Sequence, residues 1–333
     1  MKKIRYVVSD FVLGLGGGIY TFIQDHIRLM NSLGCDTKLI ILGKEDSEHR
    51  KHWNFDCEYV MTGLSYKRYD ANKLVVAHLP KDAIIYCHSF EALRGCVEAG
   101  RECYNQHHYG DIIVPQEFVR YMDIHHLYSL DQWRQMMGLS HLVTNIAQSE
   151  GIKFWGDNIC GGKHIVAYEP FELVMPTAEE IEAAEESDVI IISGFYKRKQ
   201  IPEMLEALRY SGLKVVVFST ERVIPPRGLN CKSYITRPRS EVIAHIMKSK
   251  CLFHMSYIEI MPYALLEATP YIPAVVSDVP YTRDFITPII KADINDLNLE
   301  QIVKDAIASE HTPFDIEKYK VESKQHWKDL WNL

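Results

Sequence analysis

The sequence predicts an α/β protein with two domains, each built around a parallel β-sheet. The chain has 333 residues, which is more than one hydrophobic core usually supports. Short apolar runs alternate with helical segments, as expected for parallel strands that helices cover on both faces. The alternation is interrupted once, near residues 168–187, by a segment with two prolines and an acidic run, which predicts a linker.

The N-terminal half contains the first series of alternating elements. Apolar runs predict strands at residues 4–9, 35–42, 83–88 and 141–149. A helix is expected directly after the first strand, because apolar residues recur there at helical spacing: Ile19, Phe22, Ile23, Ile27 and Met30. Gly34 is expected to end this helix, since glycine accepts the left-handed conformation of a C-terminal cap.

The C-terminal half repeats the pattern. Apolar runs predict strands at residues 189–194, 214–220, 251–256 and 273–278. Pro202 is expected to open one helix and Ser240 to cap another. We therefore expect an N-terminal domain at residues 1–170, a C-terminal domain at 171–315 and a final helix at 316–333 that packs on the N-terminal domain. Two such domains leave a cleft at the carboxyl ends of their strands, where ligands bind.

Composition excludes some classes of protein. The net charge of -7 argues against a protein that simply coats nucleic acid, although it allows a local basic site. No apolar run approaches the roughly 20 residues of a membrane-spanning helix, and MKKIRYVVSD predicts a strand rather than a signal peptide. The eight cysteines form no C-x-x-C pair, which favours buried thiols in a reducing cytoplasm.

A glycine-rich loop, GLGGGIY, lies between the first strand and the first helix. Glycines let the backbone approach a ligand, and the helix N-terminus offers free N–H groups to an anion. The loop differs from the dinucleotide fingerprint because Ile19 stands at its third glycine. A nicotinamide site with Glu45 as the ribose-binding acid stays an alternative, as does a merely tight turn.

Three cations lie between a strand and a helix of the second half: Lys197, Arg198 and Lys199. Such a cluster neutralises a diphosphate when it borders a ligand site. A solvated basic loop is the alternative interpretation.

Two glutamates, Glu259 and Glu267, bracket a short apolar segment that contains Pro262. In a helix they lie about 12 Å apart, a span that suits an extended nucleotide-sugar. A carboxylate accepts hydrogen bonds from two neighbouring hydroxyl groups. The alternatives are a helix-start carboxylate for Glu259 and a surface charge for Glu267.

Histidines cluster in three segments of the first half. His88 ends a strand, His107 and His108 follow an apolar run, and residues 125–126 form a further pair. Neither H-x-x-x-H nor H-E-x-x-H occurs, so we expect no metal site.

These segments together resemble a known family. Residues 256–286, SYIEIMPYALLEATPYIPAVVSDVPYTRDFI, resemble the donor-binding signature of retaining GT-B glycosyltransferases of the family-4 type, in which seven residues separate two glutamates. GLGGGIYTF and SGFYKRKQIPEMLEAL resemble its glycine loop and its "GR…KG…LLEAL" segment, and YCHSF and NQHHYGD resemble its histidine-bearing segments. Residues 260–264 replace the family's glycine-rich bend.

The resemblance implies a GT-B fold, with two Rossmann-like parallel-sheet domains facing a cleft. It implies retaining transfer of a hexosyl or pentosyl group from a nucleoside-diphosphate sugar, most simply a UDP-sugar, with no cofactor and no metal. Glu267 is then expected to hold the ribose, and the catalytic groups are Glu259, His107 and His108. The residues expected to contact the rest of the donor are Gly16, Gly17, Gly18, Lys197, Arg198, Lys199, Tyr263 and Ala264.

The acceptor is left open. The small size and NQHHYGDI resemble, more weakly, the T-even-type phage DNA glycosyltransferases, which implies 5-hydroxymethylcytosine in double-stranded DNA as acceptor and the host cytoplasm as location. A cell-surface polysaccharide or a small molecule is the alternative acceptor. A sugar-nucleotide epimerase and a non-catalytic nucleotide-sugar-binding protein, which the replaced glycine bend favours, are alternatives with the same fold.

Overall fold

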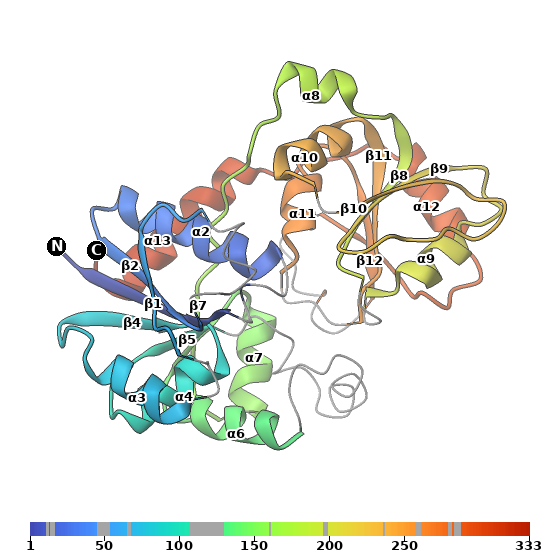
Figure 1. The fold of residues 1–333 in the computed structure, drawn as a ribbon. Coiled ribbons are helices and arrows are strands. Elements are labelled where there is room, and N and C mark those ends of the chain that lie inside the picture. Colours follow the sequence, from blue (N-terminus) through green and yellow to red (C-terminus); the bar gives the residue numbers. More distant parts are fainter. Residues whose placement is uncertain are drawn as a thin grey trace. The chain divides into compact units, whose positions relative to one another are not determined.

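The chain forms two units in a computed structural model, each with its own parallel sheet (Figure 1). The structure describes residues 1–10, 13, 17–44, 54–64, 68–106, 130–159, 161–195, 199–235, 237–257, 261–278, 282 and 288–333. The N-terminal unit consists of Met1–Phe171 and Lys320–Leu333, and the C-terminal unit of Glu172–Tyr319.

The N-terminal unit contains a seven-stranded parallel sheet in the part that the structure describes, with strand order β3-β2-β1-β4-β5-β6-β7. Its strands are β1 (Lys3–Ser9), β2 (Asp36–Leu42), β3 (Glu58–Met61), β4 (Ala83–Cys87), β5 (Tyr104–Gln106), β6 (Thr144–Ala147) and β7 (Lys163–Val166). Strand order reverses direction between β1 and β4, which makes the carboxyl ends of these two strands the expected ligand-binding edge.

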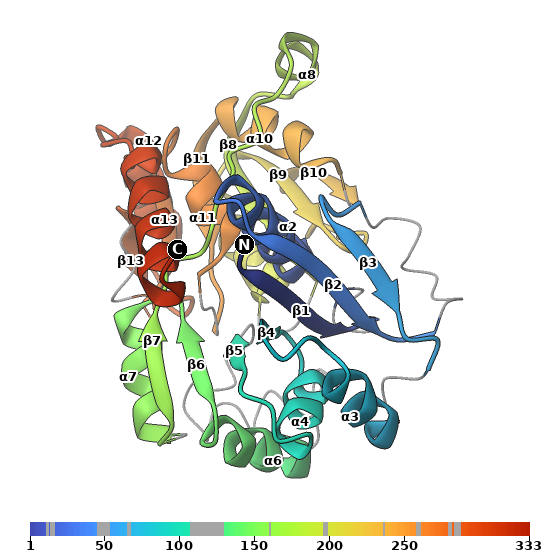
Figure 2. The same cartoon turned by 90° about the vertical axis from the view of Figure 1, so that its left-hand side faces the viewer.

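Helices cover both faces of this sheet (Figure 2). Its helices are α2 (Gly17–Ser32), α3 (Tyr69–Ala77), α4 (Phe90–Glu98), α6 (Leu130–Ser140), α7 (Glu150–Ile159) and most of α13 (Ile316–Trp331). Helices α3 and α4 pack on the face that presents Val7, Ile85 and Cys87. On the opposite face, Tyr6 of β1 contacts His26 of α2.

The first helix follows the sequence-based expectation. In α2 the apolar stripe is buried, with Phe22, Ile23 and Ile27 at 0–1% exposure. Gly34 ends the helical segment with φ +75°, a backbone conformation that costs glycine little.

Helix α13 joins the C-terminal end of the chain to the N-terminal unit. Trp327 and Trp331 are buried there, and the Trp327 indole donates to the carbonyl of Tyr168 at 2.9 Å. Ser323 Oγ donates to the carbonyls of Tyr168 and Glu169, and Lys2 Nζ donates to the carbonyl of Trp331 at 2.8 Å.

The C-terminal unit contains a six-stranded parallel sheet among its described residues, with strand order β10-β9-β8-β11-β12-β13. Its strands are β8 (Ser187–Ile192), β9 (Lys214–Ser219), β10 (Asn230–Ile235), β11 (Ser249–His254), β12 (Ala274–Ser277) and β13 (Ile290–Ala292). Its helices are α8 (Ala178–Ala183), α9 (Ile201–Ala207), α10 (Arg239–Met247), α11 (Tyr263–Ala268) and α12 (Leu299–Ala308).

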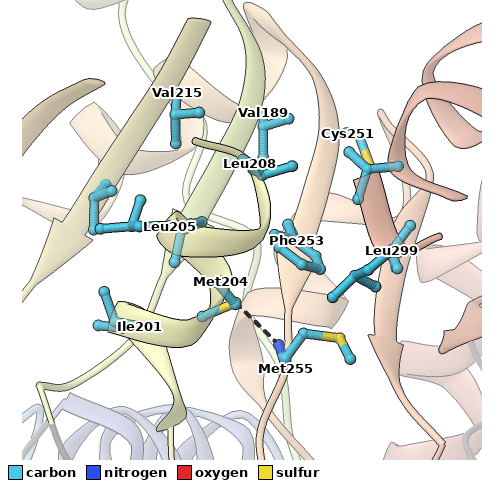
Figure 3. Packing of buried hydrophobic residues seen from close by; sticks show 14 of the residues in the cluster. Val189, Ile201, Met204, Leu205, Leu208, Val215, Cys251, Phe253, Met255 and Leu299 are labelled. Atoms are coloured by element: carbon cyan, nitrogen blue, oxygen red, sulfur yellow. Dashed lines mark hydrogen bonds between the residues drawn. The ribbon is translucent and has the colours of Figure 1, made fainter. Parts of the chain in front are cut away.

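Alternating side chains of this sheet form two cores. Val189, Val215 and Phe253 pack with helices α9 and α12 on one face, around Met204 and Leu205 (Figure 3). Ile190 and Leu252 lie on the other face with helices α10 and α11. The strand order reverses between β8 and β11, so the expected ligand edge of this unit lies at their carboxyl ends.

One predicted helix cap is wrong. Ser240 does not cap α10, because the helix begins at Arg239 after Pro238, and Ser240 Oγ instead donates to Glu180 of α8 at 2.6 Å. Proline sets its own backbone φ and ends the preceding loop, which moves the helix start upstream of the serine.

The described cysteines are free thiols. Among them Cys87, Cys96 and Cys103 lie together in the core of the N-terminal unit, with sulfur atoms within 4.8 Å of one another. No helix in the described part of the chain is long and apolar enough to span a membrane.

Candidate functional site

The switch point of the C-terminal sheet brings together the two predicted donor-binding segments. Residues 193–199 follow β8, and the segment that leads to Glu267 follows β11. Because β8 and β11 are neighbours in the sheet, both segments leave it at the same edge. The loop after β8 is also tied to the end of β9, since the Phe195 amide donates to Thr220 Oγ1 at 3.0 Å.

Hydroxyl groups without partners gather at this edge. Ser219 ends β9, Ser277 ends β12 and Ser193 directly follows β8. The hydroxyl oxygen of each is buried and has no hydrogen-bond partner in the described structure. Buried polar atoms are nearly always paired, so three unpaired hydroxyls along one edge indicate a place where a polar ligand binds.

Gln200 adds an amide to the same edge. Its side chain is 1% exposed, and neither Oε1 nor Nε2 has a hydrogen-bond partner among the described residues. Its backbone is left-handed, with φ +53° and ψ +32°. This conformation costs a residue with a side chain about 1–2 kcal/mol, and an unpaired buried amide about 1–3 kcal/mol more.

Glu267 lies in α11 and is buried rather than on the surface. Its Oε1 accepts from Nε of Arg239 at 2.5 Å, and the two side chains are 8% and 21% exposed. The Arg239 guanidinium also lies 5.5 Å from the ring centroid of Tyr263. The positive charge of Arg239 offsets part of the cost of burying the carboxylate.

The other described donor-site residues lie on the same elements. Lys199 is half-buried directly before Gln200, and Tyr263 and Ala264 are the first two residues of α11. The Ala264 side chain packs in the core with α10, so only its backbone is suited to a ligand contact.

Six predicted site residues lie outside the described residues: His107, His108, Gly16, Lys197, Arg198 and Glu259. Their predicted roles therefore stay predictions.

The switch point of the N-terminal sheet carries the glycine loop and His88. Gly17 and Gly18 begin α2, and a Cβ added to Gly18 would meet nothing within 4 Å. His88 follows β4 and is buried, with its ring 5.8 Å from that of Tyr6. The first turn of α4 adds Glu91, a buried carboxyl whose pKa is raised by burial, an effect that its own backbone N–H opposes.

The sequence patterns did not predict most of the polar groups that lie at these two switch points. Ser219, Ser277, Gln200, Arg239 and Glu91 were not singled out as site residues. A serine at or near the end of each apolar run in the C-terminal half was the available signal, because strand ends of a parallel sheet meet at one edge. No sequence pattern predicts the pairing of Arg239 with Glu267, because the two residues are 28 positions apart.

Comparisons with known proteins identify the fold. No family model matches the chain, and no curated protein sequence matches it. Among solved structures, sucrose-phosphate synthase from Thermosynechococcus elongatus is similar over 100% of this chain and 95% of its own, with a TM-score of 0.73 and 10% identity.

Two further structures are similar over the whole chain. TarM is similar over 100% of this chain and 98% of its own, with a TM-score of 0.68 and 11% identity. Trehalose-6-phosphate synthase from Burkholderia multivorans is similar over 100% of this chain and 98% of its own, with a TM-score of 0.64 and 10% identity. These neighbours are GT-B proteins, so the predicted fold is confirmed: the chain has the GT-B fold, with two Rossmann-like parallel-sheet domains.

Proposed function

We propose that this chain is a retaining glycosyltransferase that moves a hexosyl or pentosyl group from a nucleoside-diphosphate sugar to an acceptor hydroxyl. The observation that carries the proposal is the set of buried, unpaired polar groups along the carboxyl edge of the C-terminal sheet, in the same unit as the buried carboxylate of Glu267. Hydroxyls, an amide, a carboxylate and Lys199 are the groups that a phosphorylated, polyhydroxylated ligand requires.

The structural neighbours favour a UDP-sugar as donor. A TarM structure from S. aureus holds UDP and α-GlcNAc-glycerol, and the trehalose-phosphate synthase of Burkholderia xenovorans is described as UDP-forming. We therefore propose a UDP-sugar as the donor of this chain.

In the proposed reaction, Glu267 accepts hydrogen bonds from the ribose hydroxyls while Arg239 holds its carboxylate in place. Lys199, with Lys197, Arg198 and the amides of residues 16–18, stabilises the negative charge that develops on the leaving diphosphate. Glu259 and either His107 or His108 bind the transferred sugar at the reacting carbon. Retention means that the new glycosidic bond forms on the face that the diphosphate leaves.

A DNA acceptor is proposed from the sequence resemblance alone. Hydroxymethylated cytosine in DNA is the first acceptor to test, and sugar phosphates and polysaccharides are the next. Sugar acceptors are favoured by the glucose-6-phosphate that one Burkholderia xenovorans trehalose-phosphate synthase structure contains.

The experiment incubates the purified chain with a panel of UDP- and GDP-sugars, each with and without 5-hydroxymethylcytosine DNA, glucose 6-phosphate or glycerol-based acceptors. The proposal predicts acceptor-dependent release of nucleoside diphosphate, and a product whose anomeric configuration by NMR equals that of the donor. Release or isomerisation that needs no acceptor indicates an epimerase or hydrolase. Binding without release indicates a nucleotide-sugar-binding protein, and inverted product contradicts the retaining mechanism.

A further inference from the structure

Gln200 combines two energetically costly features at one position. Its backbone has φ +53°, although the chain's other described residues in this region of φ are glycines, apart from Asn332 at the exposed C-terminus. Its side chain is buried at 1% exposure, with both amide atoms unpaired in the described structure. A glycine would adopt the same backbone without strain and would bury no amide.

The backbone of Gln200 serves the fold, but the side chain does not. The Gln200 carbonyl accepts from the amide of Met204 at 2.9 Å and so starts helix α9. This contact needs no side chain. The amide group instead raises the cost of folding, and polar groups kept at such a cost are concentrated where a ligand pairs with them.

The surroundings indicate what the ligand is. Gln200 directly follows Lys199, and its loop leaves the carboxyl end of β8 beside the end of β9, where the Ser219 hydroxyl is also unpaired. An amide offers N–H donors and a carbonyl acceptor together. A phosphate oxygen only accepts and leaves Oε1 unpaired, whereas neighbouring sugar hydroxyls both donate and accept and can satisfy both amide atoms.

We propose that Gln200 is a specificity-determining ligand residue, whose side-chain amide hydrogen-bonds hydroxyl groups of a nucleoside-diphosphate sugar at the carboxyl edge of β8. This inference rests on the proposed function and adds to it a residue whose side chain is kept for the ligand alone. It makes two predictions. Removing the side chain lowers the affinity for the nucleotide-sugar, and it does not lower the stability of the folded chain.

The test compares Gln200→Gly with wild type in the full chain, using UDP-glucose, UDP-GlcNAc and UDP as probes. We expect the variant to bind the wild type's preferred UDP-sugar at least tenfold more weakly by isothermal titration calorimetry. Its Tm without ligand is expected to equal or exceed that of wild type, because glycine removes the strained backbone and the unpaired amide together.

Two further variants separate binding from folding. Asn332→Gly relieves the other left-handed residue, at φ +51°, and should leave the UDP-sugar affinity unchanged. Gln200→Leu keeps the side-chain volume without polar atoms, and should lose affinity as Gln200→Gly does.

Three outcomes decide the proposal. Unchanged UDP-sugar affinity in Gln200→Gly and Gln200→Leu overturns it while leaving the proposed function intact. A lowered Tm in both variants shows a structural role and also overturns it. If wild type binds none of the three probes, the proposed function fails and this inference fails with it.

Discussion

Arg239 and Glu267 form a largely buried ion pair in the proposed donor site. Both side chains are mostly buried, at 21% and 8% exposure, so loss of one partner leaves the other charge poorly solvated. Arg237 and Glu241, each two residues from Arg239, provide a contrast, because they approach to 3.8 Å and are 46% and 38% exposed. We expect the Arg239–Glu267 pair to contribute to the free energy of unfolding and the Arg237–Glu241 pair to contribute little to it.

We predict that Arg239→Met destabilises the chain by up to about 3–5 kcal/mol, with the upper end reduced by the partial exposure of Arg239. Glu267→Gln in the same background should recover part of this loss, since no unpaired carboxylate then remains. Urea unfolding of the double-mutant cycle measures the coupling. Arg237→Met is the matched control, with an expected loss below about 1 kcal/mol. Equal effects of the two arginine substitutions contradict a buried, coupled pair.

His26 gives the N-terminal unit a pH dependence with a defined sign. It is fully buried against Trp327, at 4.0 Å between ring centroids, and its Nδ1 lies 3.1 Å from the hydroxyl of Tyr6. Burial lowers the pKa of His26 well below 6.5. The folded state therefore keeps His26 neutral at pH values where the unfolded chain already binds a proton.

Stability from this histidine is present above pH 6.5 and is lost as the pH falls below it. The expected slope is about 1.4 kcal/mol per pH unit while only the unfolded chain is protonated. Chemical denaturation at several pH values below 6.5 should show a flatter dependence for His26→Phe than for wild type. The exposed His141→Asn variant should keep the wild-type slope, and an unchanged slope in His26→Phe refutes the assignment.

Met204 holds helix α9 to its sheet. Its side chain is fully buried among Val189, Leu205 and Phe253, and its sulfur accepts from the amide of Met255 at 3.2 Å (Figure 3). This contact joins helix α9, which follows β8, to Met255, which directly follows β11. Both elements border the proposed donor site.

Met204→Ala is predicted to cost about 2–5 kcal/mol of unfolding free energy, because it opens a cavity in a core that cannot fully collapse. Met204→Leu keeps most of the volume and should cost less than about 1.5 kcal/mol. Met175→Ala, at a methionine that is 61% exposed, serves as the control. A loss in Met204→Ala as small as that of the control contradicts the packing described for α9.

The strands that the sequence missed share a physical property. β3, β10, β7 and β13 are the four edge strands of the two sheets, and their residues are largely exposed or half-buried. An edge strand is covered less completely than an inner strand, so it lacks the continuous apolar run by which inner strands such as β8 and β9 were predicted. The fifth, β5, has three residues, which is too short for periodicity to be recognised.

The last helix, α13, completes the N-terminal unit. Trp327 and Trp331 of α13 fill the space beside His26 and Tyr86, far from them in sequence. We predict that Trp327→Ala destabilises the N-terminal unit by about 3–5 kcal/mol. Hydrogen exchange should show faster opening of β1 and α2, with β8 and β9 unchanged. Equal protection of β1 and α2 in the variant contradicts this role for α13.

The sequence predicted the two parallel sheets because inner strands and α2 carry strong local patterns. The spacing of Glu259 and Glu267 resembles a known signature, and the ribose-binding role that it implies for Glu267 stays a prediction. The sequence could not predict the left-handed backbone of Gln200 at the start of helix α9, or the partner of Glu267, which comes from another helix. Such features arise from the fold and not from local sequence.

The proposed function requires the switch point of the C-terminal unit to bind a nucleoside-diphosphate sugar. Its most direct test is the thermal stability of wild type and Glu267→Ala against a panel of nucleoside diphosphates and their sugars. A ligand at 100 times its dissociation constant adds about 2.7 kcal/mol of stability. We predict this shift for wild type with one donor, and its loss in Glu267→Ala. If no nucleotide or nucleotide-sugar stabilises wild type, the chain has the fold without the donor site, and the proposed function is wrong.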